Sequence, residues 1–308
     1  MAGGLRIVVT GATGNIGTSV VTALAAEPLV ESIVGVARRE AAWQQEKLEL
    51  VAVDLAEEVE LDELVGHADV VVHLAWRFQP THDPSTTWRT NVLGSIRMFE
   101  AVGRCGVPAL VYSSSVGAYS PGPKDDAVPE SWPTHGAAGA SYSREKAYLE
   151  RYLDYFECAH PGVRVVRLRP GFSFKHVSAS EQRRLFGGRL LPGRWIGSGA
   201  LPFVPDLNGL RMQAVHTSDL AEAFRLAVVE QVYGAFNVAS RPVVDPRVIA
   251  ELLGKRRVRV SSGLVRTVVS ASWHARLLPA SPDLFDLVRQ LPVMDTSRAR
   301  LALGWPPK

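Results

Sequence analysis

Short runs of Val, Ile and other apolar residues recur through the first half of the chain, and Gly, Pro and charged residues bound them. Between the runs lie longer stretches in which apolar residues return every three or four positions. The first pattern predicts buried strands, and the second predicts amphipathic helices. We therefore expect strands at residues 6–10, 32–37, 48–53, 69–74, 109–113 and 163–168. Helices are expected at residues 15–26, 85–104 and 141–158.

Strands that are apolar along their whole length and alternate with helices are typical of a parallel sheet covered on both faces. The sequence therefore predicts an α/β fold, a doubly wound parallel sheet of the Rossmann type, with its ligand crevice at the carboxyl ends of the strands. We expect residues 1–170 to form a dinucleotide-binding domain, to which residues 213–240 return. Residues 171–212 and 241–308 are expected to form a smaller C-terminal substrate-binding region. The second half is predicted to hold strands at 213–216, 235–238 and 256–260 and helices at 218–229 and 297–303.

The composition narrows the class of protein. Of the 308 residues, 46% are apolar and 21% are charged, which excludes a disordered chain or a coiled coil. A net charge of +3 gives no reason to expect a nucleic-acid partner. No apolar stretch is long enough to span a bilayer, and no leader pattern precedes the first strand, so we expect a cytoplasmic protein without a membrane partner. Cys105 and Cys158 are not spaced for a metal site, and we expect no bound metal.

A glycine-rich turn joins the first strand to the first helix, in the sequence Thr-Gly-Ala-Thr-Gly-Asn-Ile-Gly from position 10 to 17. Gly11 permits a tight turn, Gly14 lets the backbone approach a pyrophosphate, and Gly17 allows close packing of helix on strand. The free N–H groups at the start of the helix then face the phosphates. The residues predicted to bind the dinucleotide here are Gly11, Thr13, Gly14, Asn15, Ile16 and Gly17.

The end of the second strand indicates which dinucleotide is bound. An acid at this point would bind a ribose 2′-hydroxyl and favour NAD, but the chain has Arg38 and Arg39 before its first acid, Glu40. A guanidinium is a good partner for a 2′-phosphate, so we expect NADP with NAD also possible, and Arg38 as its ligand. An exposed pair of arginines is the alternative. Asp54, after the third strand, either accepts a hydrogen bond from the adenine amino group or caps the following turn.

Tyr142 and Lys146 carry the clearest catalytic signal. Residues four apart share one face of a helix, and a lysine ammonium beside a phenol is expected to lower the pKa of that phenol. Such a pair suits acid–base work on a hydroxyl or carbonyl group. Ser115 follows the fifth strand at the same edge of the predicted sheet and is expected to bond the substrate oxygen. Asn91, inside the preceding helix, either holds a water or bonds to backbone, and His73 is expected to be a buried core residue.

These motifs together resemble the extended branch of the short-chain dehydrogenase/reductase superfamily, the NAD(P)-dependent epimerase/dehydratase family. Matching segments occur in the family's order over nearly the whole chain, as Asp54-Leu55, His73-Leu74-Ala75, Asn91, Ser113-Ser114-Ser115, Arg169-Pro170-Gly171, Val215-His216-Thr217-Ser218-Asp219 and the closing helix. The resemblance implies that Ser115, Tyr142 and Lys146 are catalytic. It also implies cofactor contacts at Leu55, Leu74, Ala75, Trp76, Asn91, Ser113, Tyr142, Lys146, Pro170 and Phe172.

The resemblance further implies a homodimer. The helices at 85–104 and 141–158 would pair across a two-fold axis, and we expect Leu149, Leu153 and Phe156 to belong to the surface that they bury.

The chain also departs from parts of the family pattern. Nucleotide-sugar 4,6-dehydratases carry Thr-Asp-Glu at the serine position, whereas this chain has Ser115-Val116-Gly117, which disfavours that reaction. Trp76 and Phe78 are bulky where enzymes of this type that act on sugars often have small residues. The basic residues between 175 and 194 either grip a phosphate or form a solvated loop.

Two functions remain open from the sequence. The first is an NAD(P)-dependent oxidoreductase or epimerase that transfers hydride at a hydroxyl or carbonyl carbon of a small or sugar-like substrate. The second is an NADP-binding regulatory or sensor protein on the same fold, without turnover. The retained Ser115, Tyr142 and Lys146 favour the enzyme.

Overall fold

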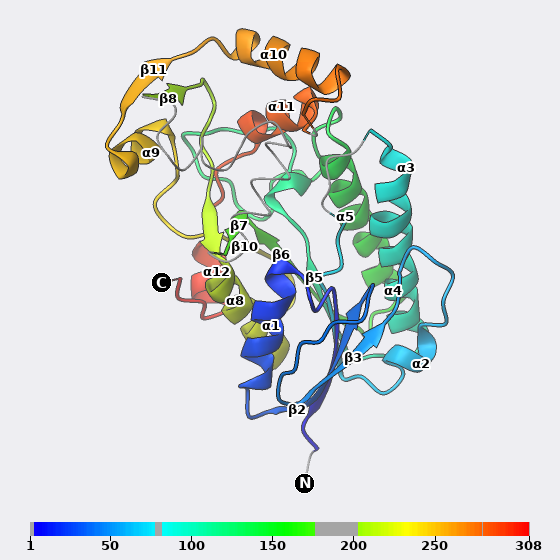
Figure 1. Ribbon diagram of the computed structural model, residues 1–308. Coiled ribbons are helices and arrows are strands. Elements are labelled where there is room, and N and C mark those ends of the chain that lie inside the picture. The colour runs from blue at the N-terminus through cyan, green and yellow to red at the C-terminus, as the bar shows by residue number, and fades with distance from the viewer. Residues whose placement is uncertain (1–2, 78–81, 176–202, 279, 308) are drawn as a thin grey trace.

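The computed structural model describes residues 3–77, 82–175, 203–278 and 280–307 (Figure 1). Its centre is a seven-stranded sheet in the order β10-β6-β5-β4-β1-β2-β3, and every neighbouring pair is parallel. This order confirms the predicted doubly wound sheet. The strands are β1 (Leu5–Thr10), β2 (Val30–Ala37), β3 (Leu48–Ala52), β4 (Val70–His73), β5 (Ala109–Ser113), β6 (Arg164–Pro170) and β10 (Gly234–Val238).

Helices cover both faces of this sheet (Figure 1). On one face, α1 (Asn15–Ala25) and α8 (Thr217–Val229) pack over Ile7 and Val9 of β1. On the other, α4 (Gly94–Arg104) and α5 (Ser141–Ala159) pack in the same cluster as Val8. Because alternate residues of a strand point to opposite faces, β1 contributes to two separate cores. Its continuous apolar sequence, and that of its neighbours, follows from this double burial.

The helix expected at residues 85–104 is not uniform. It consists of α3 (Pro84–Thr87), a π-helical turn η1 (Trp88–Leu93) and α4. A π-turn inserts one residue into the helical repeat, and here both Asn91 and Val92 become buried. The prediction of one regular helix was wrong in this respect, because apolar spacing over two turns does not distinguish the two kinds of helix.

The surface expected on α5 is also different from the prediction. Leu149, Leu153 and Phe156 are fully buried inside the chain's own core, beside Phe99 of α4. The prediction that these three side chains are available to a second subunit was wrong. The exposed side chains of the same helix include Tyr148 and Tyr155, which lie on its outer side.

Smaller elements lie beyond the carboxyl ends of the strands. Two short parallel sheets pair β7 (Phe172–Phe174) with β9 (Ala214–His216) and β8 (Phe203–Asp206) with β11 (Arg256–Arg259). Thus β9 stays outside the main sheet, whereas α8 and β10 after it belong to the central layers. The described residues also form α2 (Asp62–Val65), η2 (Val116–Ala118), α9 (Pro246–Leu253), α10 (Ser262–His274), α11 (Pro282–Gln290) and α12 (Ser297–Leu301). Most of the basic segment predicted between 175 and 194 lies outside the described residues.

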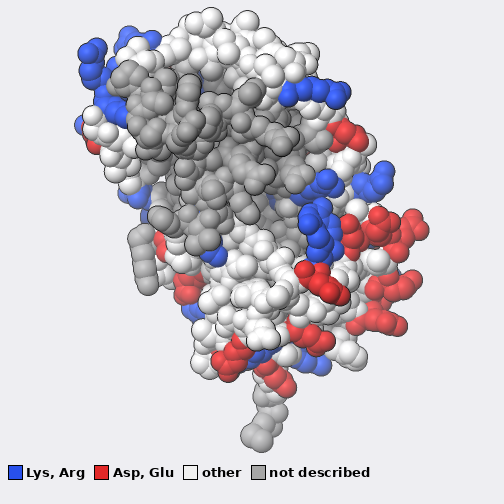
Figure 2. All heavy atoms as spheres, viewed as in Figure 1, with Lys and Arg blue, Asp and Glu red and all other residues white. Residues whose placement is uncertain are grey.

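Charged side chains are unevenly distributed on the face shown in Figure 2. Acidic residues gather at α2 and the loop before it, where Glu57, Glu58, Glu60 and Glu63 are exposed. Basic side chains gather at the end of the molecule opposite the N-terminus, where the arginines of β11 are exposed. None of the helices in the described ranges has the length and apolar character needed to cross a bilayer.

Candidate active site

The glycine-rich turn lies where β1 meets α1, and its geometry requires glycine at two positions. Gly11 has a φ of +70°, and a Cβ there would lie 2.8 Å from the backbone nitrogen of Ala75. A Cβ on Gly17 would lie 2.1 Å from the carbonyl oxygen of Gly11. Any larger residue at either position would force the strand, the turn and the helix apart.

The start of α1 offers unsatisfied hydrogen-bond donors. Gly14 is its N-cap, no side chain caps the helix, and no acidic residue lies in its first turn. Thr13 and Gly14 are exposed at the tip of the turn. Within the described residues, the buried Oδ1 of Asn15 also has no hydrogen-bond partner. Free N–H groups and the positive end of the helix dipole suit a phosphate at this position.

A series of buried, hydrogen-bonded side chains holds the end of β4 against this turn. Thr10 Oγ1 lies 2.8 Å from His73 Nδ1, and His73 Nε2 lies 2.8 Å from Ser95 Oγ. Ser95 donates to the carbonyl of Asn91, so we assign the imidazole proton to Nε2, which leaves Nδ1 to accept from Thr10. Thr10 Oγ1 accepts in turn from the backbone N–H groups of residues 74 and 75. His73 is therefore a satisfied core residue, as predicted.

Ser115 and Tyr142 meet beyond the carboxyl end of β5. Both side chains border Gly117, and a Cβ on that glycine would lie 3.3 Å from Ser115 Oγ. Ser115 Oγ also accepts from the backbone N–H of Gly117 at 2.9 Å, which fixes the serine at the start of η2. A Cβ on Gly117 would lie 2.6 Å from Tyr142 Cε1, so this glycine leaves room for the ring. The structure thus brings two of the three predicted catalytic residues close together around Gly117.

The pKa of the Tyr142 phenol differs from the expectation. Burial raises the pKa of Tyr142 to about 12, although the neighbouring Ser115 hydroxyl acts in the opposite direction. Lys146 is not a cause of this shift, so the prediction that it lowers the pKa of Tyr142 is not met in this structure. A phenol with this pKa is a proton donor at neutral pH rather than a proton acceptor.

Lys146 is buried and bonded on three sides. Its Nζ donates to the carbonyl oxygen of Ser113 at 2.7 Å and to the hydroxyl of Tyr112 at 3.3 Å. It also lies 3.5 Å from the centre of the Trp76 indole, whose ring meets that of Tyr142 edge-on at 5.7 Å. Burial lowers the pKa of Lys146 well below its usual range. Trp76 therefore contacts both predicted catalytic residues of α5.

Glu150 is a site-supporting residue that the sequence reasoning missed. Its buried carboxylate accepts from Ser114 Oγ at 2.5 Å and from two nitrogens of Arg169 at 2.8 and 2.9 Å. Burial alone would raise the pKa of Glu150, but Arg169 and Arg167 hold it at about 2. The signal was present in the sequence, since Glu150 follows Lys146 by one helical turn and lies on the same face of α5.

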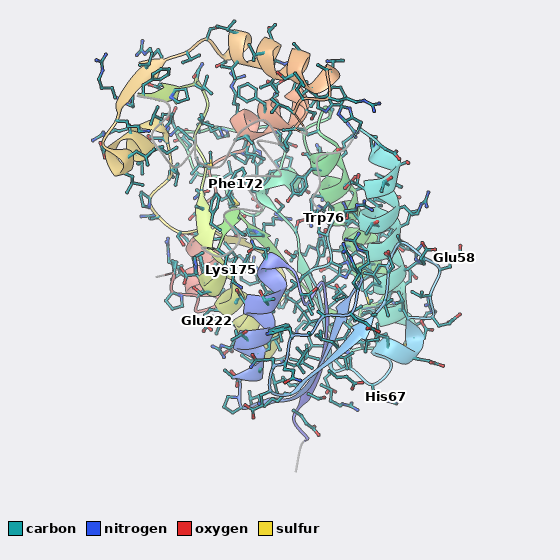
Figure 3. The ribbon with its side chains drawn as sticks, in the orientation of Figure 1. Glu58, His67, Trp76, Phe172, Lys175 and Glu222 are labelled. Atoms are coloured by element: carbon teal, nitrogen blue, oxygen red, sulfur yellow. The ribbon has the colours of Figure 1, made fainter. Side chains whose placement is uncertain are left out.

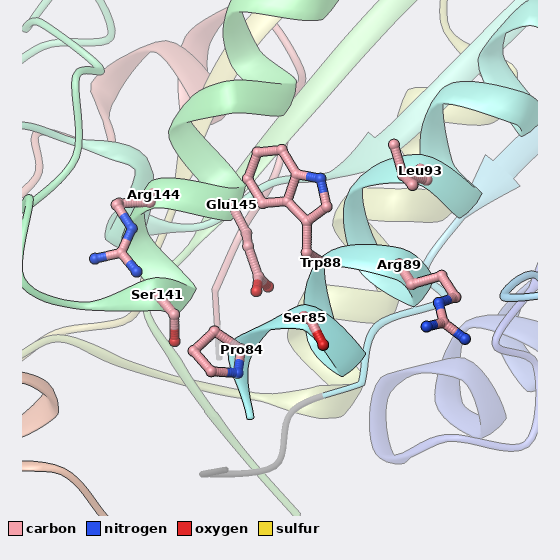
Figure 4. Close-up of a pocket in the computed structure, with 8 residues that line it drawn as sticks. All are labelled: Pro84, Ser85, Trp88, Arg89, Leu93, Ser141, Arg144 and Glu145. Atoms are coloured by element: carbon pink, nitrogen blue, oxygen red, sulfur yellow. The ribbon is translucent and has the colours of Figure 1, made fainter. Parts of the chain in front are cut away.

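Asn91 and Glu145 connect the π-turn to α5. The Asn91 side chain accepts from the backbone of Arg77 at 2.7 Å and donates to Glu145 at 2.8 Å. Of the two roles considered for Asn91, the bond to backbone is present in the structure. Glu145 also accepts from Thr87 at 2.5 Å. It forms part of a separate pocket of about 390 Å³ on the outer side of α5, shown in Figure 4. The pocket is lined by Pro84, Ser85, Trp88, Arg89, Leu93, Ser141, Arg144 and Glu145, and so includes neither Ser115 nor Tyr142.

The residues predicted for the rest of the dinucleotide lie along the same edge of the sheet. Arg38 is exposed directly after β2, and no ion pair joins it to an acid in the described ranges. Asp54 Oδ1 accepts from Ala56 N at 2.9 Å, which is the predicted capping bond. Leu55 is buried under α4, Pro170 ends β6, and Phe172 begins β7. The geometry leaves the cofactor roles of these residues as predictions.

Comparisons with known proteins agree with this arrangement. The sequence profile described as "NAD dependent epimerase/dehydratase family" matches residues 7–239. The chain is similar to an L-arabinose 1-dehydrogenase (NAD(P)(+)) of Haloferax volcanii, with 30% identity over 63% of this chain and 78% of the relative. It is 26% identical to UDP-glucose 4-epimerase 3 of Oryza sativa subsp. japonica, over 67% of this chain and 59% of the relative.

The lengths of the relatives vary. An uncharacterized protein of Mycobacterium tuberculosis matches 98% of this chain at 24% identity, but the match spans only 28% of that longer protein.

Solved structures share the whole fold. The UDP-glucose 4-epimerase of Thermus thermophilus, solved in complex with NAD, superposes with a TM-score of 0.68 over 99% of this chain and 94% of that structure, at 23% identity. The matched profile runs from β1 to the residue after β10 and thus covers the glycine-rich turn, the serine after β5 and the Tyr–Lys pair. The chain therefore belongs to the NAD dependent epimerase/dehydratase family, an extended branch of the short-chain dehydrogenases/reductases.

Proposed function

We propose that this chain is an NAD(P)-dependent oxidoreductase or epimerase that transfers hydride at a hydroxyl or carbonyl carbon of a small or sugar-like substrate. The closeness of Ser115 and Tyr142 around Gly117, beyond the carboxyl end of β5, is the observation that supports it most directly. A carbonyl oxygen could approach both side chains together there.

The residues present fit a dinucleotide. The uncapped start of α1, the glycine-rich turn and the unpartnered Asn15 Oδ1 together offer donors and an acceptor where a pyrophosphate and its sugar would lie. When bound, the nicotinamide would give or take the hydride. Thr13, Gly14 and Ile16 would face the phosphates, and Pro170 and Phe172 would flank the nicotinamide.

Each catalytic side chain then has one task. Ser115 donates a hydrogen bond to the substrate oxygen and polarises its carbonyl. Tyr142, whose pKa of about 12 keeps the phenol protonated, gives its proton to that oxygen during reduction and takes it back during oxidation. Lys146, one helical turn away, binds the ribose hydroxyls of the cofactor.

Arg38 makes NADP the expected cofactor, with NAD as a weaker ligand. Its exposed guanidinium follows β2, where the 2′ position of the adenosine ribose would lie. Calorimetric titration should show tighter binding of NADPH than of NADH, and the Arg38→Ala variant should lose that preference. Equal affinities in the wild-type chain would contradict the assignment.

Substrate and reaction type are best approached through the relatives. An arabinose dehydrogenase and a UDP-glucose epimerase both act at carbons that carry oxygen, so a panel of aldoses and their UDP esters is the natural set to screen. Val116 and Gly117 stand where a 4,6-dehydratase has its acidic pair, and we therefore exclude dehydration from the proposal.

A screen with NADP⁺ and NAD⁺ tests the proposal directly. Formation of reduced cofactor, or interconversion of two epimers, with at least one substrate is the expected result. Tight cofactor binding without turnover of any aldose, UDP-sugar or small carbonyl would favour the regulatory alternative.

A further inference from the structure

Lys175 places a positive charge beside the glycine-rich turn from the other half of the chain. It follows β7 directly, and its Nζ donates to Thr18 Oγ1 of α1 at 2.8 Å. Figure 3 shows Lys175 next to the start of α1. Residues 157 positions apart in the sequence thus meet at the first turn of the helix.

This position combines two independent features that attract an anion. The helix has no side-chain cap and no acid in its first turn, so its free N–H groups carry partial positive charge. Lys175 adds a full charge, and no ion pair connects it to an acid among the described residues. Thr18, one turn after the N-cap, is a neutral partner that leaves this charge uncompensated.

The Lys175 side chain is long enough to contact a ligand bound at the glycine-rich turn. Thr18 Oγ1 also lies 3.2 Å from the carbonyl oxygen of Gly14, the N-cap residue. The ammonium of Lys175 is therefore held about one helical turn from the N–H groups that would bind a phosphate. Lysine has four rotatable side-chain bonds, so a small change of rotamer brings Nζ onto a phosphate oxygen there.

We propose that Lys175 binds the pyrophosphate of the dinucleotide, and so closes the phosphate site from the side of β7. The proposal rests on the proposed function, because it assumes that a dinucleotide occupies the turn. It adds a residue that neither the glycine-rich motif nor the Tyr–Lys pair contains, and it links cofactor binding to the segment of the chain that follows β6.

The test compares ligands with and without the pyrophosphate. NADH and ADP-ribose carry it, and adenosine lacks it. For the Lys175→Met variant we expect dissociation constants for NADH and ADP-ribose about tenfold or more above the wild-type values, as for loss of a charge-assisted hydrogen bond. The affinity for adenosine should stay unchanged, and Lys175→Arg should restore most of the affinity for NADH.

Lys47, directly before β3, offers a matched control at the opposite end of α1. Its Nζ donates to the carbonyl oxygen of Glu27 at 3.0 Å, just beyond the C-terminal end of α1. Lys47→Met removes the same charge at the opposite end of the helix and should leave all three affinities unchanged. Equal binding of NADH by Lys175→Met and wild type would overturn the proposal while the proposed function stands. A loss for NADH but not for ADP-ribose would also overturn it, and a wild-type chain that binds neither of these ligands nor NADPH would refute both.

Discussion

Single atoms decide the geometry around Tyr142, and Gly117 is the clearest case. A Cβ at this position would lie 2.6 Å from Tyr142 Cε1 and 3.3 Å from Ser115 Oγ. Gly117→Ala should therefore displace the phenol and lower kcat at least tenfold, with cofactor affinity nearly unchanged, as for small misplacements of a catalytic group.

Gly162→Ala is the matched control for this change, because nothing lies within 4 Å of the Cβ that it would introduce. Steady-state kinetics of both variants check the prediction. Equal kcat values for Gly117→Ala and wild type would show that the tyrosine is not held by this contact.

The buried His73 predicts a pH dependence of stability. Burial lowers the pKa of His73 to about 3, and the unfolded chain has its ordinary value near 6.5. Between these values the unfolded state binds the extra proton, so the free energy of unfolding falls as the pH falls. From this group alone we expect a loss of about 2 kcal/mol between pH 7 and pH 5.

Urea unfolding of the wild type and of His73→Gln at pH 7, 6 and 5 measures this contribution. The variant should be less stable at pH 7 and should lose less stability on acidification. Parallel curves for the two proteins would mean that His73 takes up its proton equally in both states.

At the scale of elements, the network around Glu150 joins α5 to β5 and β6. Its carboxylate faces two buried arginines, Arg167 and Arg169. Glu150→Gln keeps the shape of the side chain but leaves the arginines without their shared counter-charge. We expect the free energy of unfolding to fall by about 3 kcal/mol, as for other buried pairs that lose one partner.

Glu251→Gln is the control, since Glu251 forms an exposed pair with Arg247 on α9 and should change stability by less than about 0.5 kcal/mol. Denaturant titration compares the two variants. A Glu150→Gln protein as stable as the control would contradict this view of the network.

Some helices and strands could be predicted from the sequence and others could not. Val70, Val71 and Val72 of β4 form a continuous apolar run, so the burial of this strand could be predicted from the pattern. The π-turn at Trp88–Leu93 could not be predicted from the pattern, because it depends on the hydrogen bonds of the Asn91 side chain with Arg77 and Glu145. The closeness of Ser115 and Tyr142 could be predicted, because both follow the sheet at one edge. The contact of Trp76 with Lys146 could not, because it depends on the direction of the Trp76 side chain.

At the scale of the whole molecule, the outer face of α5 predicts self-association. Tyr148 and Tyr155 are 46% and 62% exposed, and Leu93 of the neighbouring π-turn is 41% exposed. The Trp88 ring meets that of Tyr148 edge-on at 5.1 Å and continues this apolar surface. We propose that two copies bury this surface against each other as a homodimer. These side chains then take the place of Leu149, Leu153 and Phe156, which the sequence analysis expected at the interface.

Sedimentation at micromolar concentration should show about twice the 33.5 kDa of one chain. Tyr148→Glu with Tyr155→Glu should shift the protein to monomer, and Tyr233→Glu, at an exposed tyrosine outside α5, should not. A wild-type chain that sediments as a monomer would reject the dimer.

The role of Tyr142 as the proton carrier is the central claim, and one comparison tests it most directly. Once a substrate is identified, kcat is measured for the wild type and for Tyr142→Phe, with a deuterium isotope effect to establish that hydride transfer limits the rate. Phenylalanine keeps the ring that Gly117 and Trp76 contact and removes only the hydroxyl. We expect a loss in kcat of about 10²- to 10⁴-fold with cofactor affinity preserved. A Tyr142→Phe enzyme that turns over at the wild-type rate, with hydride transfer limiting, would contradict it.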